Sequence, residues 1–391
     1  MLSHAAPGRT SRYAVHIVTS HATELARFVL KLNLHLAIVC CTFVVKVENP
    51  TSRDIADLAG VSQATVSRAL RNSPLVRQET RDRIQQIARE LNYFVNRNAA
   101  GLRTHQSNTI ALLMFDETDG TDKKMNLFFW SMLDNITRSA ARLGYDVLVS
   151  LQQLTDDWHI EYQASHRADG LILLGYGDYA EYREKLAALA AANTRFIIWG
   201  PIVKDQPGHS FGCDNERGGY QATKHLIDLG RRNIAYFGRK EHRSPEHASR
   251  YNGYVRALRE AHLEPNDNLR IPADNSEKLG YEAVLALLDR GEVFDAVFGV
   301  TDLIAIGAMR ALADNGVTVP NDVSVIGFDD MPLAAHVTPA LTTVQQNAQM
   351  GGDGLVEGIV GLIKGQPVES KLMAPKLIIR DSCGADRHTR N

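Results

Sequence analysis

Hydrophobic and polar residues follow two different patterns along the chain. Between residues 51 and 96, apolar residues recur every three or four positions, which is typical of amphipathic helices. From residue 108 onward, short apolar runs alternate with amphipathic segments, which is typical of a parallel β-sheet covered by helices. These patterns predict a small all-α domain at residues 51–96, a connecting segment at residues 97–107 and a larger α/β region at residues 108–391.

The all-α segment carries the start and stop signals of a helix-turn-helix. Thr51 stands three residues before Asp54, which is the pattern of a capping box, and apolar residues follow at helical spacing. Gly60 falls where the residue after a helix must accept a positive φ angle, and Ser62 offers its hydroxyl as the N-cap of a second helix. The turn of about three to four residues between the two helices has the length expected of a helix-turn-helix.

The second helix is expected to bury Val66 and Leu70, which lie four residues apart. Its N-terminal residues then face outward, as those of a recognition helix do in the major groove of DNA. There glutamine can pair with adenine, arginine with guanine, and alanine can contact the methyl group of thymine. The predicted DNA contacts in this domain are Thr51, Ser62, Gln63, Ala64, Thr65, Ser67 and Arg68.

The charge of the same segment supports a nucleic-acid partner. A third helix is expected to start near Gln78, with one apolar face and one face rich in arginine. From Thr51 to His105 there are nine arginines and five acidic residues, a local charge of 9 − 5 = +4, whereas the whole chain has a formal net charge of −2. The positive field is therefore concentrated in this domain.

A glycine-containing turn between two short helices also occurs in all-helical domains that do not bind DNA, so the turn alone leaves both possibilities open. The sequences IADLAGVSQATVSRAL, TRDRIQQIARELNY and NRNAAGLR, however, closely resemble the headpiece and hinge of the LacI/GalR family of bacterial transcription regulators. The AGVS-x-x-TVSR core of this match is highly specific. The resemblance implies a transcriptional regulator that binds double-stranded operator DNA.

The resemblance also implies that the connecting segment is a hinge helix in the minor groove of DNA. Leu102 matches the leucine that wedges between base pairs at the operator centre. Asn96 and Ala99 are further predicted DNA contacts. Val95 stands where the family usually has proline, and Gly101 costs about 1 kcal/mol of helicity relative to alanine. We therefore expect this hinge to become ordered only on DNA; the alternative is a solvated linker with an incidental leucine.

The composition is that of an ordinary globular protein of more than one domain, with 391 residues, 44% hydrophobic and 23% charged. The four cysteines form no C-x-x-C pair and have no histidine at ligand spacing. We therefore expect no metal site, no disulfide framework and no cofactor. A reducing cytoplasm fits this usage best.

Residues 1–50 do not fit the rest of the chain. Their apolar run at residues 34–45 is far shorter than the roughly 20 apolar residues that cross a membrane, and it lies too far from the start for a secretory signal. We expect no membrane partner. Our hypothesis is that this extension is not native and that synthesis begins at Val47.

The α/β region is expected to hold two doubly wound parallel-sheet lobes with a cleft between them, because about 280 residues is large for one sheet. The strands are expected at residues 110–115, 146–150, 170–174, 196–199, 234–237, 296–300 and 323–328. Intervening helices are expected at residues 127–143, 220–229 and 303–315.

The resemblance extends through this region in DNERGGYQATKHLIDLGRRNIAYFG, SRYNGY, TDLIAIGAMRAL and VSVIGFDD. It implies the fold of periplasmic sugar-binding proteins, in which three crossovers join the lobes. Lobe 1 would then comprise about residues 108–200 and 347–365, and lobe 2 about residues 201–346 and 366–391.

Ligands of open α/β sheets bind beyond the carboxyl ends of strands, where carboxylates can accept hydrogen bonds from sugar hydroxyls and arginine can donate several. By resemblance, Arg250 and Asp302 match the two most recurrent effector contacts. The predicted effector contacts are Asp116, Phe128, Trp199, Arg250 and Asp302. Asp302 could instead only cap the helix that follows it, and the adjacent Asp329 and Asp330 are expected to be structural.

The chain contains none of the common catalytic motifs, so we do not expect an enzyme. A stand-alone sugar-binding protein is the alternative, but it would leave the headpiece unexplained. We interpret the chain as a cytoplasmic regulator whose operator affinity is controlled by a sugar or sugar derivative. We expect this regulator to be a repressor. One headpiece covers one half-site, so a near-palindromic operator requires a homodimer.

Overall fold

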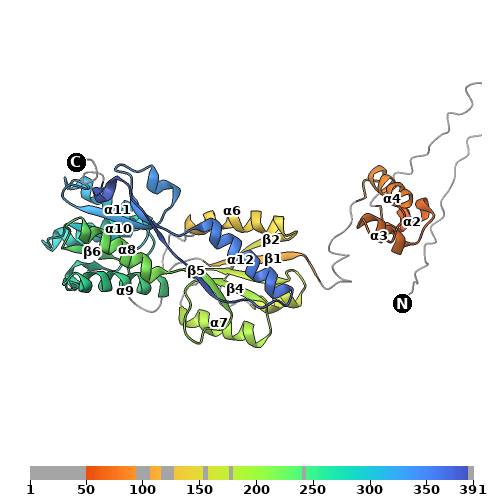
Figure 1. The fold of residues 1–391 in the computed structure, drawn as a ribbon, viewed down its shortest axis with the longest axis horizontal. Helices are drawn as coiled ribbons and strands as arrows, with labels where there is room; N and C mark the ends of the chain where they lie inside the picture. Colours follow the sequence, from red (N-terminus) through yellow and green to blue (C-terminus); the bar gives the residue numbers. More distant parts are fainter. Residues whose placement is uncertain are drawn as a thin grey trace, which may run out of the picture. The chain divides into compact units, whose positions relative to one another are not determined.

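The computed structural model describes residues 50–93, 106–115, 127–152, 157–175, 179–239 and 244–385. The chain divides into two compact units, Met1–Val95 and Asn96–Asn391. Figure 1 draws both units as ribbons. Within the described residues, no helix is long and apolar enough to cross a membrane.

Residues 50–93, the described part of the first unit, contain three helices, α2 (Ser52–Ala59), α3 (Gln63–Leu70) and α4 (Gln78–Glu90). They share one small core to which each helix contributes. Its fully or nearly fully buried residues are Ile55, Ala56, Ala59, Val66, Ala69, Val76, Ile84 and Ala88. Leu70, which we expected to face inward, is only partly buried beside Ala69.

The local signals that the sequence predicted are present. The Asp54 carboxylate accepts a 2.8 Å hydrogen bond from the Thr51 backbone N–H, and the Thr51 hydroxyl accepts one from the Asp54 N–H, which completes the capping box. Gly60 has a φ of 64°, and the Ser62 hydroxyl accepts a 3.2 Å hydrogen bond from the Thr65 N–H at the start of α3. The predicted helix-turn-helix is confirmed.

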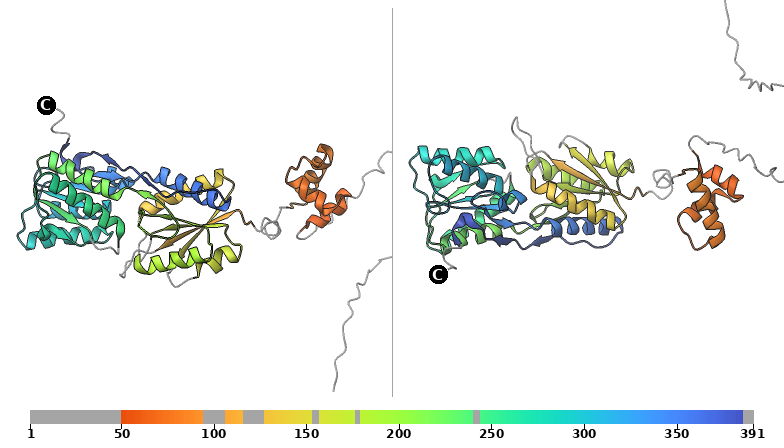
Figure 2. Two further views of the ribbon diagram at one scale, coloured as in Figure 1. Left: turned by 60° about the horizontal axis from the view of Figure 1, so that its bottom comes forward. Right: turned by 90° about the horizontal axis from the view of Figure 1, so that it is seen from above.

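The described residues of the second unit form two six-stranded sheets, each between two layers of helices (Figure 1 and Figure 2). The sheet of lobe 1 has the order β11-β5-β4-β3-β1-β2, and that of lobe 2 has the order β12-β10-β9-β8-β6-β7. All neighbouring strands are parallel except the β10–β12 pair. The two doubly wound lobes predicted from the sequence are thus confirmed.

The strands of lobe 1 are β1 (Thr109–Phe115), β2 (Asp146–Gln152), β3 (Gly170–Leu174), β4 (Phe196–Trp199), β5 (His209–Cys213) and β11 (Lys371–Met373). Helices α6 (Leu127–Arg142) and α12 (Ala348–Ile363) pack on one face, and the π-helix η1 (His159–Ala164) and α7 (Tyr179–Ala191) on the other. The core lies on both faces of the sheet, as expected for strands that are almost continuously apolar.

The strands of lobe 2 are β6 (Ile234–Phe237), β7 (Arg270–Ile271), β8 (Ala296–Gly299), β9 (Ser324–Asp329), β10 (Thr342–Gln345) and β12 (Lys376–Ile378). The helices are α8 (Asn215–Asp228), α9 (Pro245–Glu260), α10 (Glu277–Asp289) and α11 (Asp302–Asp314), with 3₁₀ turns η2 (Asp267–Leu269), η3 (Pro332–Ala335) and η4 (Asp381–Cys383). Their apolar faces form one core with the sheet.

The lobe boundaries differ from two of those we expected. Because β5 belongs to the sheet of lobe 1 and α8 packs in lobe 2, the first crossover lies at Asp214 and not near residue 201. Because β11 also belongs to lobe 1, the third lies at residues 374–375 and not near residue 366. Both strands are short and have little apolar periodicity, and β11 is an edge strand, so the sheet that they join cannot be read from their pattern.

Close helix packing fixes one part of lobe 2. A Cβ atom at Gly219 of α8 would lie 2.1 Å from the carbonyl oxygen of Arg250 in α9, and one at Gly253 would lie 2.1 Å from that of Glu216. Only glycine permits this approach of the two backbones. It brings the Arg250 side chain within reach of Asn215 at the start of α8.

Candidate functional site

The exposed start of α3 carries the predicted base-reading residues. Gln63, Ala64 and Arg68 are exposed, and within the described part of the chain neither Gln63 nor Arg68 makes a side-chain hydrogen bond. Their side chains are therefore available to the base edges of DNA. Thr65 and Ser67 are half-buried at the flank of this surface.

The hydroxyl groups around this surface already have local partners. The Thr51 and Ser62 hydroxyls cap α2 and α3, and the Thr65 hydroxyl lies 3.0 Å from that of Ser62. The Ser67 hydroxyl accepts a 3.0 Å hydrogen bond from Arg71. These groups are exposed or half-buried, and hydroxyl oxygens have further capacity, so they retain the ability to contact phosphates.

One arginine of α4 has an internal role. The Arg81 guanidinium donates hydrogen bonds of 3.0 and 2.9 Å to the carbonyl oxygens of Ser73 and Val76. It therefore fixes the loop between α3 and α4. Arg83 and Arg89 are exposed on the same helix. The positive face that the sequence predicted for α4 thus consists of its other arginines.

Four of the predicted contacts lie outside the described residues: Asn96, Ala99, Leu102 and Asp116. The first three belong to the predicted hinge and the last to the predicted effector site. The proposed non-native extension also lies outside the described residues, except for its last residue, Pro50.

A cavity of about 320 Å³ lies between the two lobes. Its lining comes from α6, from the loop after β9 and from the crossover that leads from β10 into α12. The lining residues are Phe128, Ser131, Asp329, Asp330, Met331, Gln345, Gln346, Asn347, Ala348 and Gln349. The lining combines an aromatic face with carboxylate, amide and hydroxyl groups.

Of the four predicted effector contacts that lie within the described residues, only Phe128 lines this cavity. Trp199 is 5% exposed and packs against Phe128, with ring centroids 5.6 Å apart. Arg250 and Asp302 are 4% and 0% exposed and lie outside the lining. Gln345 and Gln346 lie at the carboxyl end of β10, where the rule for open α/β sheets places ligands, but we predicted no strand at residues 342–345 and so did not predict these two residues.

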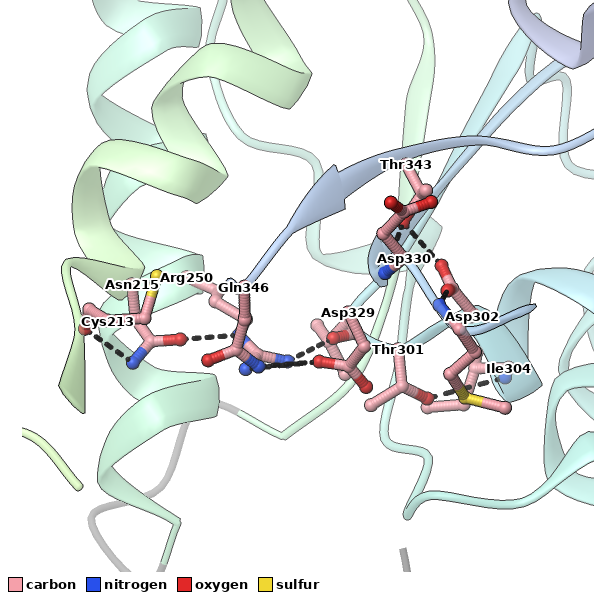
Figure 3. A network of polar contacts seen from close by, with 12 residues as sticks. Cys213, Asn215, Arg250, Thr301, Asp302, Ile304, Asp329, Asp330, Thr343 and Gln346 are labelled. Carbon is pink, nitrogen blue, oxygen red and sulfur yellow. Dashed lines mark hydrogen bonds and ion pairs between the residues drawn. The ribbon is translucent and has the colours of Figure 1, made fainter. Parts of the chain in front are cut away.

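Arg250 lies beside Asp329, which lines the cavity (Figure 3). Its Nε donates a 2.8 Å hydrogen bond to Asn215 Oδ1, and its Nη1 donates to the carbonyl oxygen of Val300. Its Nη2 lies 3.8 Å from Asp329 Oδ1, and its guanidinium lies 3.7 Å above the Phe328 ring. Arg250 therefore places positive charge next to the Asp329 side chain.

Asp329 presents an unused hydrogen-bond acceptor. Its Oδ1 accepts a 2.6 Å hydrogen bond from Gln346 Nε2, whereas its Oδ2 is buried and has no partner in the described part of the protein. Burial raises the pKa of Asp329 to about 6, against the lowering effects of Arg250 and the Gln346 hydrogen bond. Asp330 beside it accepts hydrogen bonds of 2.6 Å from Arg380 and 2.7 Å from Gln345. We expected both aspartates to be structural, but both line the cavity.

Asp302 is fully buried at the start of α11. Thr301 is the N-cap of that helix, so the alternative in which Asp302 is only the cap is wrong. The Asp302 carboxylate accepts hydrogen bonds of 2.7 Å from the Met331 N–H and 2.5 Å from the Thr343 hydroxyl. Burial, with the nearby Asp329 charge as the second cause, raises the pKa of Asp302 well above its usual range.

Comparison with known proteins agrees with this architecture. Residues 51–96 match the family of bacterial regulatory proteins of the lacI type, and residues 223–383 match the periplasmic binding protein-like domain. The transcriptional repressor PurR of Vibrio atlanticus (strain LGP32) is 30% identical over 338 residues, which cover 85% of this chain and 98% of PurR. The transcriptional regulator GalR of Escherichia coli (strain K12) is 30% identical over 341 residues, covering 85% and 95%.

Two solved structures are similar over nearly their whole length. The lac repressor dimer bound to operator and the anti-inducer ONPF has 27% sequence identity and a TM-score of 0.75, covering 86% of this chain and 99% of that chain. The complex of the transcriptional regulator CelR with cellobiose has 28% identity and a TM-score of 0.63, covering 85% and 99%.

A helix-turn-helix domain joined to a two-lobed periplasmic-binding-protein-like core defines a ligand-responsive DNA-binding regulator. The chain belongs to the LacI family of bacterial transcriptional regulators. The family resemblance stated from the headpiece and core motifs is confirmed.

Proposed function

We propose that this regulator is a cytoplasmic repressor that binds a near-palindromic operator as a homodimer, and that a sugar or sugar derivative in the interlobe cavity changes its operator affinity. The observation that carries this proposal is the cavity of about 320 Å³, whose lining includes both lobes and the crossover between them. The similar CelR structure contains cellobiose, which supports a carbohydrate ligand.

On the DNA side, we assign base contacts to Gln63, Ala64 and Arg68, because these side chains are exposed at the start of α3. The hydroxyl groups of Thr51, Ser62, Thr65 and Ser67 are assigned to phosphates, since phosphate contacts fix the orientation of a protein on the duplex. By resemblance, Asn96, Ala99 and Leu102 would add minor-groove contacts.

On the effector side, the cavity suits a ligand with both an apolar face and hydroxyl groups. The Phe128 ring supplies an apolar surface, and Gln345, Gln346 and Asn347 supply amide donors and acceptors. The unpaired Oδ2 of Asp329 can accept a hydrogen bond from a ligand hydroxyl. Arg250 would act mainly through Asp329, because its guanidinium is buried among protein partners. Trp199 would hold the Phe128 ring in place through their ring contact. Asp116 is proposed as an effector contact from the family resemblance alone.

The position of the cavity offers a route from effector to DNA. Its lining residues Gln345 to Gln349 span the segment that connects β10 of lobe 2 to α12 of lobe 1. A ligand that contacts this segment differently in two lobe arrangements must shift the equilibrium between them. We propose that this shift reaches the hinge segment that precedes β1 and so alters operator affinity.

Lobe 1 also offers a surface for a second copy of the chain. Strand β2 is one of the two edge strands of its described sheet, and Val149 and Leu151 on that strand are 45% and 60% exposed. Trp130 in the adjacent helix α6 is 52% exposed, and Leu143, directly after that helix, is 45% exposed. An exposed apolar edge is unfavourable in a monomer, so its burial between two protomers would stabilise a homodimer.

A thermal-shift screen of the full chain tests the effector class. The panel contains galactose, maltose, cellobiose and ribose as sugars, and hypoxanthine and adenine as nucleobases. We expect one or more sugars to raise the melting temperature, because a ligand that binds only the folded state stabilises it. Stabilisation by a nucleobase alone would overturn the sugar assignment, and the Asp289→Asn variant, altered at an exposed residue of α10, should respond as the unaltered protein does.

A further inference from the structure

We propose that Asp169 is a positioning residue that anchors the end of the predicted hinge segment, residues 97–107, to the sheet of lobe 1. The anchoring follows from the contacts of Ser107 and Asn108. Its consequence for operator affinity rests on the proposed role of the hinge in DNA binding.

Asp169 immediately precedes β3 and is only 7% exposed. Its Oδ1 accepts hydrogen bonds of 2.7 Å from the Ser107 backbone N–H and 3.0 Å from the Ser107 hydroxyl. Its Oδ2 accepts a 2.8 Å hydrogen bond from the Asn108 N–H. Hydrogen bonds to a charged acceptor are about twice as strong as those between neutral groups. One buried carboxylate therefore holds both the last residue of the predicted hinge and the first residue of the core.

Backbone hydrogen bonds fix the same segment between two strands. The Asp169 N–H donates a 2.8 Å hydrogen bond to the Thr109 carbonyl oxygen, and the Asp146 N–H at the start of β2 donates one of 2.9 Å to the Asn108 carbonyl oxygen. Asn108 has a φ of 51°, in the left-handed region that asparagine adopts more readily than most residues. The chain therefore enters β1 through a turn that contacts on both sides hold.

This anchor lies at the edge of lobe 1 opposite to the effector cavity. Strands β1 and β3 are parallel, with Ile110 opposite Gly170, so both start at the same edge of the sheet. The cavity is lined by Phe128 near the start of α6, which follows the other end of β1. In Figure 1 and Figure 2, the amino end of β1 lies on the side of lobe 1 that faces away from lobe 2. Asp169 is therefore separate from the proposed effector contacts.

Lobe 2 contains an equivalent carboxylate that has no connection to the hinge. Asp295 immediately precedes β8 and accepts hydrogen bonds of 2.8 and 3.0 Å from the N–H groups of Arg232 and Asn233, which precede β6. Its own N–H donates a 3.0 Å hydrogen bond to the Asn233 carbonyl oxygen. That segment follows α8 within lobe 2, whereas the segment held by Asp169 leads from the headpiece. Asp295 is thus a matched control for a purely structural role.

Hydrogen–deuterium exchange of the full chain, without DNA or ligand, tests the anchoring. Asp169→Ala should raise exchange of the Ser107 and Asn108 amides by about tenfold or more, because both N–H groups lose their acceptor. The peptides that are compared contain both residues at internal positions. Peptides covering residues 232–237 should exchange as in the unaltered protein, and Asp295→Ala should show the reverse pattern. Unchanged exchange of Ser107 and Asn108 in Asp169→Ala would overturn the inference.

Operator affinity distinguishes a positioning role from a purely structural one. The probe is the duplex that the unaltered protein selects from a random DNA library, and affinity is measured well below the melting temperatures of all variants. Asp169→Ala should weaken binding by about fivefold or more, because additional residues must then be ordered when the hinge binds DNA. Asp295→Ala should bind as the unaltered protein does. Equal effects of the two variants would reduce Asp169 to a structural residue.

A conservative variant keeps the test decisive if Asp169→Ala does not fold. In Asp169→Asn the amide oxygen can still accept from Ser107, but the amide nitrogen cannot accept from the Asn108 N–H. This variant should give intermediate values in both measurements, and values equal to those of the unaltered protein would overturn the inference. Neither measurement needs an effector, so a failed sugar screen would leave the anchor intact. Unchanged exchange with normal operator binding would remove the anchor and leave the proposed function standing.

Discussion

The Nη2 atom of Arg250 lies 3.8 Å from Oδ1 of Asp329, and the two side chains are only 5% and 1% exposed. This ion pair is therefore almost wholly removed from water. Burial nevertheless raises the pKa of Asp329 to about 6, so desolvation outweighs the attraction of the guanidinium. We therefore expect the stability of the core to depend on the partner Arg250 and on the protonation of Asp329, and so on pH.

Replacing Arg250 by alanine should destabilise the core by about 3–5 kcal/mol, because it leaves Asp329 buried without a counter-charge. The matched control is Arg256→Ala. Arg256 pairs with Glu216 at 2.6 Å, but both side chains are 45% exposed, so its loss should cost less than about 1 kcal/mol. Urea unfolding of both variants measures the difference, and equal small losses would show that the buried pair has no special weight.

Stability of the core should fall as pH rises through the range in which Asp329 ionises. The folded-state pKa, about 6, lies above the ordinary value of 3.8 for an aspartate, so the folded state favours the protonated form. The associated stability is fully present below about pH 4 and is lost by about pH 7, a change of roughly 3 kcal/mol from this group. Asp302, whose pKa is also raised, acts in the same direction.

The check is the difference in unfolding free energy between the unaltered protein and Asp329→Asn, measured from pH 4 to pH 7. The difference should change with pH, because only the unaltered protein carries the titrating group. A pH-independent difference would mean that Asp329 ionises normally.

Replacing Arg68 by alanine should weaken binding to the specific operator by about 1–3 kcal/mol and relax the preference at one base pair per half-site. The control is Arg81→Ala, which should lower the melting temperature of the headpiece, because Arg81 holds the loop between α3 and α4. Arg81→Ala should not alter base preference. Equal weakening of specific and random DNA by Arg68→Ala would assign Arg68 to phosphates.

Placing charge on the exposed edge of lobe 1 should separate the proposed homodimer. Leu151→Lys introduces an amine at a position that is 60% exposed on β2, and burial of that charge between protomers would be costly. Light scattering should show the mass of a monomer. The operator affinity of this variant should also be weaker than that of the unaltered protein. Val293→Lys, at a residue that is 77% exposed in lobe 2, should remain dimeric. A dimer that survives Leu151→Lys would place the interface elsewhere.

The sequence predicted those features that depend on neighbouring residues. The capping box of Thr51 and Asp54 and the positive φ of Gly60 follow from local hydrogen bonding and steric freedom, and both are present. Most strands of the core were also predicted, because buried parallel strands are continuous apolar runs. The short strands β5, β7, β10, β11 and β12 were missed, since their places in the sheets depend on long-range pairing.

The site depended on contacts that a sequence does not display. Asp302 and Asp329 both follow or end strands, yet one is enclosed by Met331 and Thr343 and the other lines the cavity. The difference arises from the positive φ angles of Asp329 and Asp330, which turn the loop after β9. No pattern of residue types distinguishes such a loop from an ordinary strand end.

The measurement that tests the central claim most directly is operator affinity of the full chain with and without the sugar that gives the largest thermal shift. For the unaltered protein we predict that this sugar changes the operator dissociation constant by about fivefold or more. Asp329→Ala should bind the operator normally without sugar and should lose most of this response, because its cavity lacks the side-chain acceptor. A full response in Asp329→Ala, or no effect of any stabilising sugar on the unaltered protein, would contradict the account.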